Sequence, residues 1–524
     1  MRSRIALSTL TLAVSLVACS ANPGPPPVEE VTPSTTQTTA ATTTTSPPAD
    51  VVRETIAVGI DPLRNGLNPH LLADDSAFVA SLASLVLPSA FRNGEIDRDV
   101  LVSAAEVEAV GEAVQTLRYE ISPEAQWSDG TPITGADFRY LWTSMNNTSG
   151  VIDAAAYNSI SAVRTSSAGK IVEVDLHRRL SSWQGLFAHL LPSHLVSGQA
   201  FDQALLNDVP ASAGRYMVQS VDRSRGVVTL HRNDRFWGVD PALTDVLQFR
   251  EMRSVASGSD QLRSGQVSFL DVTPQETSVE AYGLMAENQV RTLETPRELQ
   301  ITFNTASPSL TTASQRAQLA SLIDVPLVAR LAAGRDRTLA VPDFQVPEAD
   351  VAQLRELSQA QPLRIAADPA DDTASAAVRT LIDLLGRQGI EAELVPAELA
   401  DITTTGLPEG EIDAVVTWRN SLGTPVDVAS AYQCPSTPGS PGTSNLSGYC
   451  VPATDEVLEG FLAGDNPAGI PDFVRRLEAL EHLTVPLLRE TRVQVLGTGI
   501  VGVDPLLDNW PSGISSAASW RISD

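Results

Sequence analysis

Hydrophobic and polar positions alternate in regular patterns along most of the chain. Every second residue of 117–121 is hydrophobic, which is typical of a half-buried strand. Ser-Asp-Gly at 128–130 is a turn cluster, and Thr134 stands three residues before Asp137, the spacing of a helix capping box. From Phe138 onward, hydrophobic residues recur at helical spacing. This stretch therefore predicts a strand, a tight turn and a capped amphipathic helix.

The same patterns predict strands before and after this stretch. They are expected at 56–60, 172–176, 216–221, 227–230 and 299–303. From Leu363 the pattern becomes strand, helix, strand. Strands are expected at 363–367, 392–395 and 412–418, with a helix over 375–387 that is closed by Gly389. Strands that alternate with helices indicate an α/β fold.

The first residues have the pattern of a secretory signal. Arg2 and Arg4 precede an apolar run at 5–17, which is too short to span a membrane. The run ends Leu-Val-Ala-Cys at 16–19, which matches a bacterial lipobox and predicts lipidation of Cys19. The alternative is a plain signal peptide with a cysteine there by chance. We expect a signal peptide at 1–18 and a protein anchored by lipid to the outer face of the plasma membrane.

Residues 19–51 are rich in proline and threonine. Three prolines at 25–27 and four threonines at 42–45 cannot build a core. We expect a flexible tether here, with folded sequence beginning near Glu54.

Length and charge narrow the class of protein. The chain has 524 residues, 43% of them hydrophobic, which is enough for two or three domains with cores. The formal net charge of −27 argues against nucleic-acid binding and against adhesion to anionic lipid through a basic patch.

Three cysteines are present, and lipidation of Cys19 leaves Cys434 and Cys450. In an oxidising compartment a disulfide is the default for such a pair. The alternative is two buried thiols.

The sequence carries no motif of an enzyme or a metal site. Its six histidines have no close ligand spacing, and it has no nucleophile elbow and no phosphate-binding glycine loop. We therefore expect no catalytic residues, no metal and no cofactor. A secreted hydrolase is therefore less favoured than the two binding functions described below.

Several short motifs, in order, resemble those of family 5 solute-binding proteins, the extracytoplasmic receptors of peptide and nickel importers. They are Trp-Ser-Asp-Gly-Thr-Pro at 127–132, Arg-Asn-Asp-Arg-Phe-Trp at 232–237, Phe-Asn-Thr at 303–305, Asn-Leu-Ser-Gly-Tyr at 445–449 and Val-Pro-Leu at 485–487. The resemblance implies an α/β, two-lobed periplasmic-binding-protein (Venus-flytrap) fold with an extra subdomain. It places lobe I at 52–75, 207–297 and 487–524, an inserted subdomain at 76–206, and lobe II at 298–486.

The resemblance also indicates a ligand site at Trp418, Arg419, Asn420 and Ser421. Peptide-binding relatives tend to read Trp-x-x-Asp-Tyr-x-Asp-Pro here, and the first aspartate typically binds the peptide's ammonium group. This chain has Ser421 and Thr424 at the two aspartate positions. Peptide binding through the amino terminus is therefore disfavoured, because a buried ammonium needs a carboxylate partner. We add Asn304 and Asn68 as candidate ligand contacts. The alternative is that Trp418 belongs to the core and Arg419 to the surface.

Two segments at 66–70 and 84–89 resemble more narrowly the LpqW-like mycobacterial lipoproteins of this family. That subgroup is linked to mannosylated phosphatidylinositol glycolipids and the assembly of lipomannan and lipoarabinomannan. The first hypothesis is therefore a lipid-anchored monomer that binds or senses an envelope glycolipid, with a membrane glycosyltransferase as a possible partner. The alternative is an importer's receptor for peptides or another small solute, which works with an ABC permease.

Overall fold

The computed structural model describes residues 53–435 and 444–523. The predicted signal peptide 1–18, the lipidation site Cys19 and the linker 19–51 lie outside the described residues.

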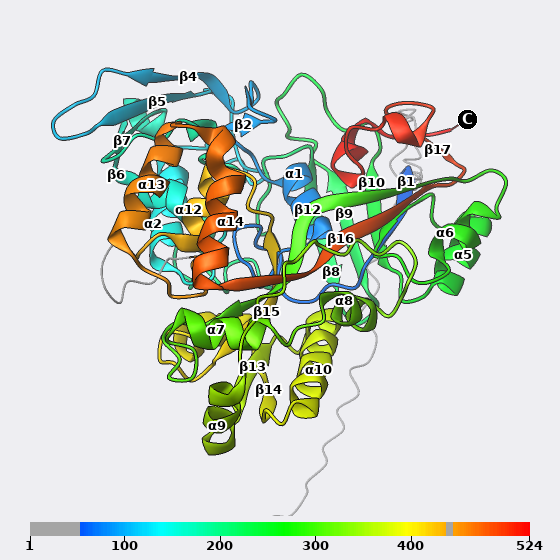
Figure 1. Cartoon of the computed structure of the whole chain (residues 1–524). Coiled ribbons are helices and arrows are strands. Elements are labelled where there is room, and N and C mark those ends of the chain that lie inside the picture. The colour runs from blue at the N-terminus through cyan, green and yellow to red at the C-terminus, as the bar shows by residue number, and fades with distance from the viewer. Residues whose placement is uncertain (1–52, 436–443, 524) are drawn as a thin grey trace, which may run out of the picture. The chain divides into compact units, whose positions relative to one another are not determined.

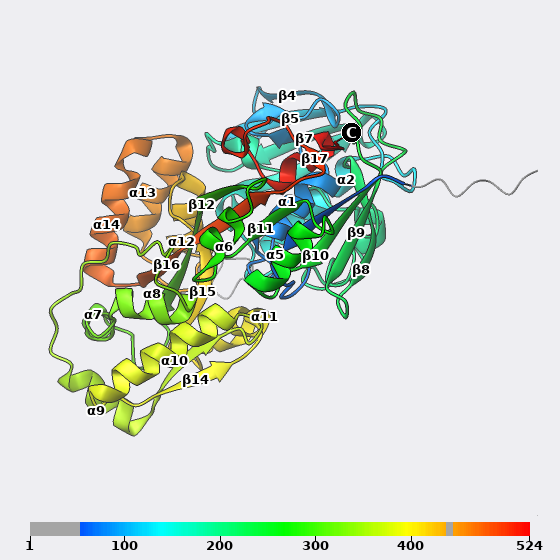
Figure 2. The same cartoon turned by 90° about the vertical axis from the view of Figure 1, so that its right-hand side faces the viewer.

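A ten-stranded mixed sheet runs through both lobes (Figures 1 and 2). In order across the sheet, its strands are β14 (Ala392–Pro396), β13 (Leu363–Ala367), β15 (Ala414–Asn420), β12 (Gln289–Phe303), β16 (Thr484–Leu496), β11 (Phe269–Val272), β1 (Thr55–Ile60), β10 (Val246–Glu251), β9 (Val227–Arg232) and β8 (Tyr216–Asp222). All the strands predicted at 56–60, 216–221, 227–230, 299–303, 363–367, 392–395 and 412–418 are confirmed in this sheet.

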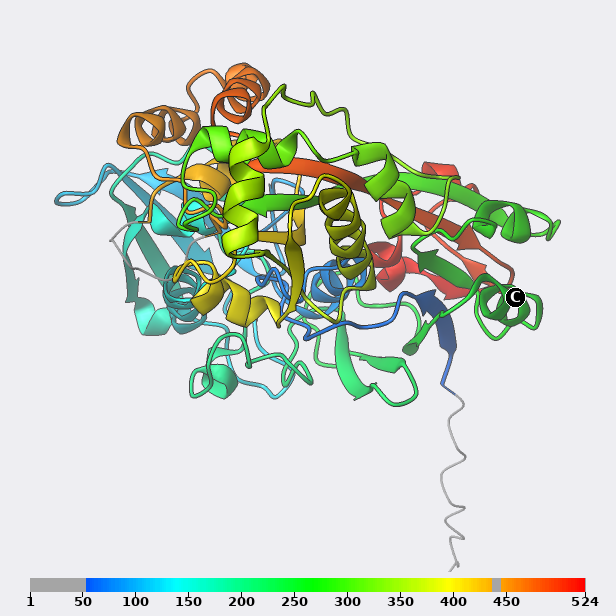
Figure 3. The same cartoon turned by 60° about the horizontal axis from the view of Figure 1, so that its bottom comes forward.

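Strands β12 and β16 are the long members of the sheet and connect the two lobes. They pair antiparallel and lie side by side (Figure 3). Their register shifts between Glu294 and Glu298, so Pro296 and Arg297 stand outside the regular ladder with β16. Such a bulge re-aims the side chains within it. The predicted lobe boundaries at 297/298 and 486/487 fall inside these two strands.

A separate four-stranded antiparallel sheet, in the order β4-β5-β7-β6, forms the inserted subdomain. Its strands are β4 (Leu101–Val107), β5 (Gln115–Ile121), β7 (Ile171–Leu176) and β6 (Ile160–Ser166). The predicted strand, turn and helix of the opening motif are confirmed here. Gly130 turns the chain at φ 92°, and Thr134 and Asp137 form the capping box of α2 (Gly135–Asn147). Trp127 and Phe138 are fully buried, so the motif builds the core of this subdomain.

The second lobe contains the predicted strand, helix, strand unit. β13 is parallel to both β14 and β15, and α10 (Asp372–Arg387) packs with α8 (Val325–Ala333) over them. The helix begins three residues before the prediction because Asp371 caps it, accepting a hydrogen bond from the Ala374 amide.

Helices α12 (Pro425–Tyr432), α13 (Pro452–Ala463) and α14 (Ile470–Glu481) share a hydrophobic core with the inserted subdomain. The Ala155 amide in α3 (Ala154–Asn158) donates to Ser430 Oγ of α12 at 3.2 Å. The predicted inserted subdomain (76–206) therefore packs against helices of the predicted lobe II (298–486). The exact domain boundaries remain a prediction.

The remaining elements cover the sheets or close short turns. They are the helices α1 (Ala77–Val86), α4 (Ser193–Val196), α5 (Val255–Arg263), α6 (Ser278–Gly283), α7 (Ala313–Ala320), α9 (Ala352–Ala360) and α11 (Leu399–Asp401), and the two-residue strands β2 (Phe91–Arg92), β3 (Glu95–Ile96), β17 (Ile500–Val501) and β18 (Arg521–Ile522). Within 53–435 and 444–523, no helix has the length and apolar character needed to cross a membrane.

Candidate functional site

The predicted ligand residues 418–421 lie at the end of β15 and just beyond it. Trp418 and Arg419 are consecutive on the strand, so their side chains point to opposite faces of the sheet. Trp418 is buried in the second-lobe core, opposite Leu299 on β12. Arg419 is the ladder partner of Glu298 and faces the other side. The two predicted ligand residues therefore lie in different environments.

The ring of Trp418 is covered by a cation from its own chain. The guanidinium carbon of Arg297 lies 5.6 Å from the ring centre, a cation–π distance. The indole Nε1 of Trp418 is buried and finds no hydrogen-bond partner within the described ranges. In this structure, Arg297 therefore covers a face of the ring of Trp418, one of the predicted ligand residues.

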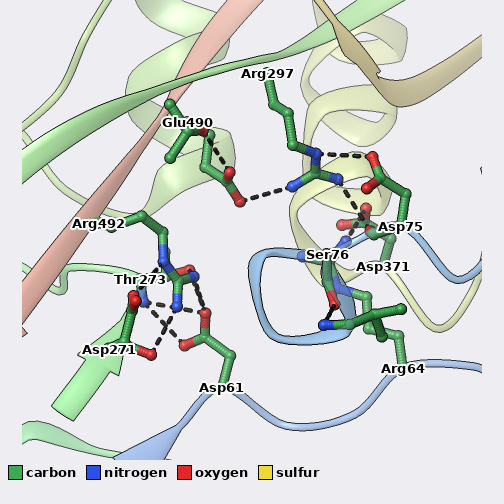
Figure 4. Close-up of polar contacts among 12 residues, drawn as sticks. Asp61, Arg64, Asp75, Ser76, Asp271, Thr273, Arg297, Asp371, Glu490 and Arg492 are labelled. Carbon is green, nitrogen blue, oxygen red and sulfur yellow. Dashed lines mark hydrogen bonds and ion pairs between the residues drawn. The ribbon is translucent and has the colours of Figure 1, made fainter. Parts of the chain in front are cut away.

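Arg297 joins three segments of the chain (Figure 4). Its Nε donates to Asp75 Oδ2 and its Nη1 to Glu490 Oε1, both at 2.8 Å, and its Nη2 donates to the Asp75 carbonyl at 3.0 Å. Burial opposes the guanidinium charge, but the two carboxylates outweigh burial and raise the pKa of Arg297. Asp75 precedes α1, whereas Arg297 and Glu490 lie on β12 and β16. This trio, the Arg297 network, therefore ties the first lobe to the connecting strands.

A second set of contacts joins the loop after β1 to the start of α10. Arg64 Nη1 pairs with Asp371 Oδ2 at 2.6 Å, and Asn65 Nδ2 donates to Asp368 Oδ2 at 3.2 Å (Figure 4 shows the first pair). The N-terminus of a helix favours a carboxylate, and Asp371 caps α10 at that position. Arg64 therefore pairs with a carboxylate that the cap already holds in place.

Farther along β16, Arg492 makes a separate network inside the first lobe (Figure 4). Its Nε pairs with Asp271 Oδ1 at 2.9 Å, and its Nη1 pairs with Asp61, whose carboxylate also accepts from Thr273. These carboxylates raise the pKa of Arg492 against the opposing effect of burial. The network fixes β16 to β11 and to the end of β1.

Arg419 is the charged group that lacks such partners. Burial lowers its pKa to about 10, although the charge of Asp153 acts in the opposite direction. Its Nη1 is buried and has no hydrogen-bond partner among the residues described. A buried guanidinium with an unused donor is costly unless a ligand supplies the acceptor.

Arg419 and Asn420 line two adjoining cavities of about 20 Å³ each, which together we call the Arg419 chamber. The chamber lies where segments predicted to belong to different lobes meet. The residues of its wall are Leu72, Ile152, Asp153, Gln300, Thr302, Leu422, Asp427, Ser430, Ala431, Tyr432, Ser444, Leu446, Ser447 and Thr484. The wall thus offers hydroxyl, amide, carboxyl and guanidinium groups at close quarters.

Asp153 is the carboxyl group that the sequence did not reveal. It stands before α3 in a left-handed conformation, φ 56°, and makes no capping hydrogen bond. Burial and the nearby charge of Asp427 raise its pKa to about 7. Burial also raises the pKa of Asp427, which forms a capping box with Thr424 at the start of α12. The neutral form of Asp153 therefore persists to a higher pH than that of an exposed carboxyl group.

A larger groove adjoins the chamber. Its volume is about 520 Å³, within the usual range of ligand sites. It shares Gln300, Leu422, Tyr432 and Thr484 with the chamber. Its lining includes residues of α14 and residues 343–347, and we call it the α14 groove.

The other predicted ligand residues have internal roles in this structure. Ser421 donates its amide to the Pro296 carbonyl at 2.8 Å, and Thr424 caps α12. Asn304 is buried and donates to the carbonyls of Leu407 and Ile412, both at 2.8 Å. The chamber and groove linings do not include these three residues.

Asn68 is likewise fully buried. Its Nδ2 donates to the Phe201 carbonyl at 3.0 Å, and its Oδ1 accepts from the His70 amide at 3.1 Å. Of the predicted ligand residues, the structure brings Arg419 and Asn420 together at the chamber. It does not bring Trp418, Ser421, Asn304 or Asn68 to the same place.

The predicted disulfide is confirmed. Cys434 and Cys450 are bonded, with 4.7 Å between their Cα atoms. The bond joins the end of α12 to the start of α13 and so fixes two of the helices near the chamber. The described part of the chain has no group of three or more His, Cys, Asp and Glu side chains arranged to hold a metal ion.

Two lobes connected by two long strands, with a polar chamber where their segments meet, define a solute-binding architecture. The family model for bacterial extracellular solute-binding proteins, family 5 (middle), matches residues 103–421, and the chain belongs to this family. Relatives with this fold bind solutes outside the cytoplasm.

Named relatives differ in what they bind. The chain is 27% identical over 489 residues to the probable monoacyl phosphatidylinositol tetramannoside-binding protein LpqW of Mycobacterium tuberculosis, covering 80% of this chain and 75% of that protein. It is 30% identical over 184 residues to the oligopeptide-binding protein OppA of Mycobacterium bovis, covering 33% of this chain and 31% of that protein. The solved structure of AgaA from A. tumefaciens R10, in complex with agropinic acid, has a TM-score of 0.68 at 16% identity and covers 90% of this chain and 99% of AgaA. The AgaA likeness shows the fold alone.

Proposed function

We propose that this protein is a lipid-anchored receptor, without catalytic activity, that binds an anionic envelope glycolipid between its lobes. The ligand class is a mannosylated phosphatidylinositol, a precursor of lipomannan and lipoarabinomannan. Arg419 contacts the phosphate, and the rest of the ligand lies beyond the chamber, because its two cavities of about 20 Å³ are too small to hold more.

The unused donor of Arg419 is the observation that carries the proposal. A guanidinium binds phosphate or carboxylate through two parallel hydrogen bonds, and burial makes this pairing stronger. Burial raises the pKa of Asp153 to about 7 and also raises the pKa of Asp427, whereas the pKa of Arg419, about 10, stays above neutral pH. The similarity to the M. tuberculosis relative, whose name specifies a phosphatidylinositol tetramannoside, extends over 80% of the chain.

An importer's receptor for peptides is the second candidate. The partial similarity to an oligopeptide-binding protein favours it. Against it stands the chemistry of the site, because Ser421 and Thr424 supply no carboxylate for an ammonium and Arg419 would repel one. In the first candidate the partner is a membrane glycosyltransferase, and in the second it is an ABC permease.

Native mass spectrometry of protein purified from its own membrane tests the proposal. We expect a co-purifying species with the mass of an acylated, mannosylated phosphatidylinositol. Arg419→Gln should lose that species, and Arg476→Gln, which removes an exposed arginine outside the chamber and groove, should retain it. Protein that carries only peptides, or an Arg419→Gln variant that keeps the lipid, would overturn the proposal.

A further inference from the structure

The α14 groove contains a carboxylate that its surroundings do not use. Glu298 lies on β12, lines the groove and makes no side-chain hydrogen bond among the residues described. Burial raises its pKa, although the charge of Arg489, its ladder partner on β16, acts in the opposite direction from beyond ion-pair distance. Although Arg419 is its ladder partner on β15, the two side chains are not within ion-pair distance, and they line different cavities. Glu298 is therefore an available acceptor in a half-enclosed site.

The rest of the groove lining combines polar and apolar groups. Gln300 and Gln345 each contribute a side-chain amide, and the Nε2 of Gln300 also donates to Thr302 Oγ1 at 3.0 Å. Phe344, Pro347 and Pro486 contribute apolar side chains. Polar groups beside apolar side chains suit a ligand whose rings carry hydroxyls at their edges and C–H groups on their faces.

The groove's charge excludes the anionic end of a ligand. Glu298, Asp343 and Glu478 all line it, and its one arginine, Arg475, pairs with Asp472 at 2.7 Å. Glu478 is already satisfied, because it accepts hydrogen bonds from Tyr432 and from the Thr484 hydroxyl. An anion therefore fits at Arg419, and a neutral polyhydroxylated segment fits in the groove.

The volumes of the cavities and the residues that they share support placing the anion at Arg419 and the neutral segment in the groove. Each cavity of the Arg419 chamber, at about 20 Å³, has space for little more than a water molecule. A ligand held at Arg419 must therefore extend into the adjoining space, and the groove of about 520 Å³ meets the chamber at Gln300, Leu422, Tyr432 and Thr484.

We propose that the α14 groove is the subsite for the neutral oligosaccharide portion of the ligand, with Glu298 accepting hydrogen bonds from its hydroxyls. This inference rests on the proposed function, since it places the sugar chain of the same glycolipid. Under this proposal, contacts along the groove determine the length of ligand that the site accepts, and the enclosed volume does not.

The test uses a neutral probe that cannot bind through Arg419. Isothermal titration or saturation-transfer NMR of the full chain with α-linked mannotetraose should detect binding. Glu298→Ala removes the unused acceptor and should weaken this binding about tenfold, as expected for a charge-assisted hydrogen bond. Its matched control, Glu294→Ala, removes an exposed carboxylate from the same strand outside the groove and should bind as the parent does.

A second pair of variants tests the groove by obstruction. Ala479→Arg places a bulky side chain in the groove, whereas Leu480→Arg places it on the next residue of α14, which is 72% exposed and outside the groove. Only Ala479→Arg should reduce mannotetraose binding, again by about tenfold.

The outcomes separate this inference from the proposed function. Loss of the native lipid in Arg419→Gln, together with no effect of either groove variant on mannotetraose or on the lipid, would overturn the groove assignment and keep the function. No lipid in the native protein would overturn the function. In that case, mannotetraose binding that depends on Glu298 would still support an oligosaccharide site, and its absence would overturn that site as well.

Discussion

Arg297 on β12 and Trp418 on the neighbouring strand β15 lie in contact, with the guanidinium carbon 5.6 Å from the ring centre. The same guanidinium is bonded to Asp75 from the first lobe and to Glu490 from β16. One side chain therefore covers a face of the Trp418 ring and connects the first lobe to the core of the second. This arrangement stabilises contact between the lobes without any ligand between Arg297 and Trp418.

Removing Arg297 should destabilise the protein strongly. Arg297→Met would leave Asp75 and Glu490 nearly buried without their cation, and breaking such a network costs roughly 3–5 kcal/mol. Urea unfolding should show this loss in the free energy of unfolding. The control is Arg263→Met, which breaks an exposed pair with Asp260 and should cost less than about 1 kcal/mol. Equal effects of the two substitutions would refute a structural role for the Arg297 network.

The sequence predicted the strands that form this site, but it did not predict the side-chain contacts between them. Alternation along β12 identified that strand, because side chains on a strand alternate between faces, and the strand, helix, strand pattern from Leu363 identified β15. The strand pattern extended through Trp418, and residues 419 and 420 also belong to the strand. The sequence could not show that Arg297, more than a hundred residues away, would cover Trp418, since this contact depends on strand pairing and on the bulge in β12.

Local patterns were sufficient for capping and for the disulfide. Thr134 and Asp137 form their capping box with atoms only three residues apart, and Cys434 and Cys450 lie in one short loop region. No local pattern marks Asp153 as a site residue. Its carboxyl group lines the chamber because α3, β15 and α12 pack together there, and this tertiary packing cannot be read from the local sequence.

Asp153 should make stability depend on pH. Its folded pKa of about 7 exceeds the ordinary value of 3.8, so the folded state keeps a proton that the unfolded chain loses. The contribution of this group to the free energy of unfolding is therefore full below about pH 4 and falls as pH rises to about 7. Asp153→Asn removes the titration and tolerates the left-handed backbone. We expect the variant to be more stable than the parent by up to about 4 kcal/mol at pH 8, with the gain vanishing near pH 4.

Urea unfolding of both proteins at pH 4, 6 and 8 checks this prediction. Asp427→Asn is not a suitable control because Asp427 caps α12, whereas Asp260→Asn changes an exposed carboxylate far from the chamber. A stability difference that stays constant from pH 4 to pH 8 would show that Asp153 titrates normally.

The disulfide should contribute to stability through the loop it closes. Cys434 and Cys450 are 16 positions apart, and closing a loop of this length stabilises a protein by roughly 3 kcal/mol. Cys434→Ser combined with Cys450→Ser should lower the free energy of unfolding by about this amount. Reductant should lower the stability of the parent similarly and leave the double variant unchanged. Two free thiols in non-reduced peptide maps of exported protein would contradict the bond itself.

Membrane attachment is expected to depend on Cys19, which lies outside the described residues. The lipobox at 16–19 predicts lipidation there, and the net charge of −27 offers no electrostatic substitute. Cys19→Ser should move the protein from the membrane fraction to the culture medium or soluble fraction. Export and signal cleavage must be verified in the same cells, since an uncleaved variant would stay with the membrane for another reason. A cleaved, exported variant that still sediments with membranes would disprove the lipid anchor.

The final prediction concerns peptides. We expect the site not to bind free peptides tightly through their amino terminus. Ser421 and Thr424 replace the aspartates of peptide-binding relatives, and the structure shows that Thr424 is engaged in capping α12. Arg419 adds a buried positive charge beside this position, which opposes an ammonium group. A missing charge-assisted bond alone should weaken peptide affinity by about tenfold or more.

Isothermal titration with mixed tri- to pentapeptides measures this directly. The same peptides with acetylated amino termini are the control, because acetylation removes the charge and leaves the rest of the peptide intact. We expect weak binding at most, with no difference between the free and acetylated sets. Submicromolar affinity that disappears on acetylation would mean that another carboxylate, with Asp153 the nearest candidate in the chamber, receives the ammonium. That result would favour the importer's receptor over the glycolipid receptor.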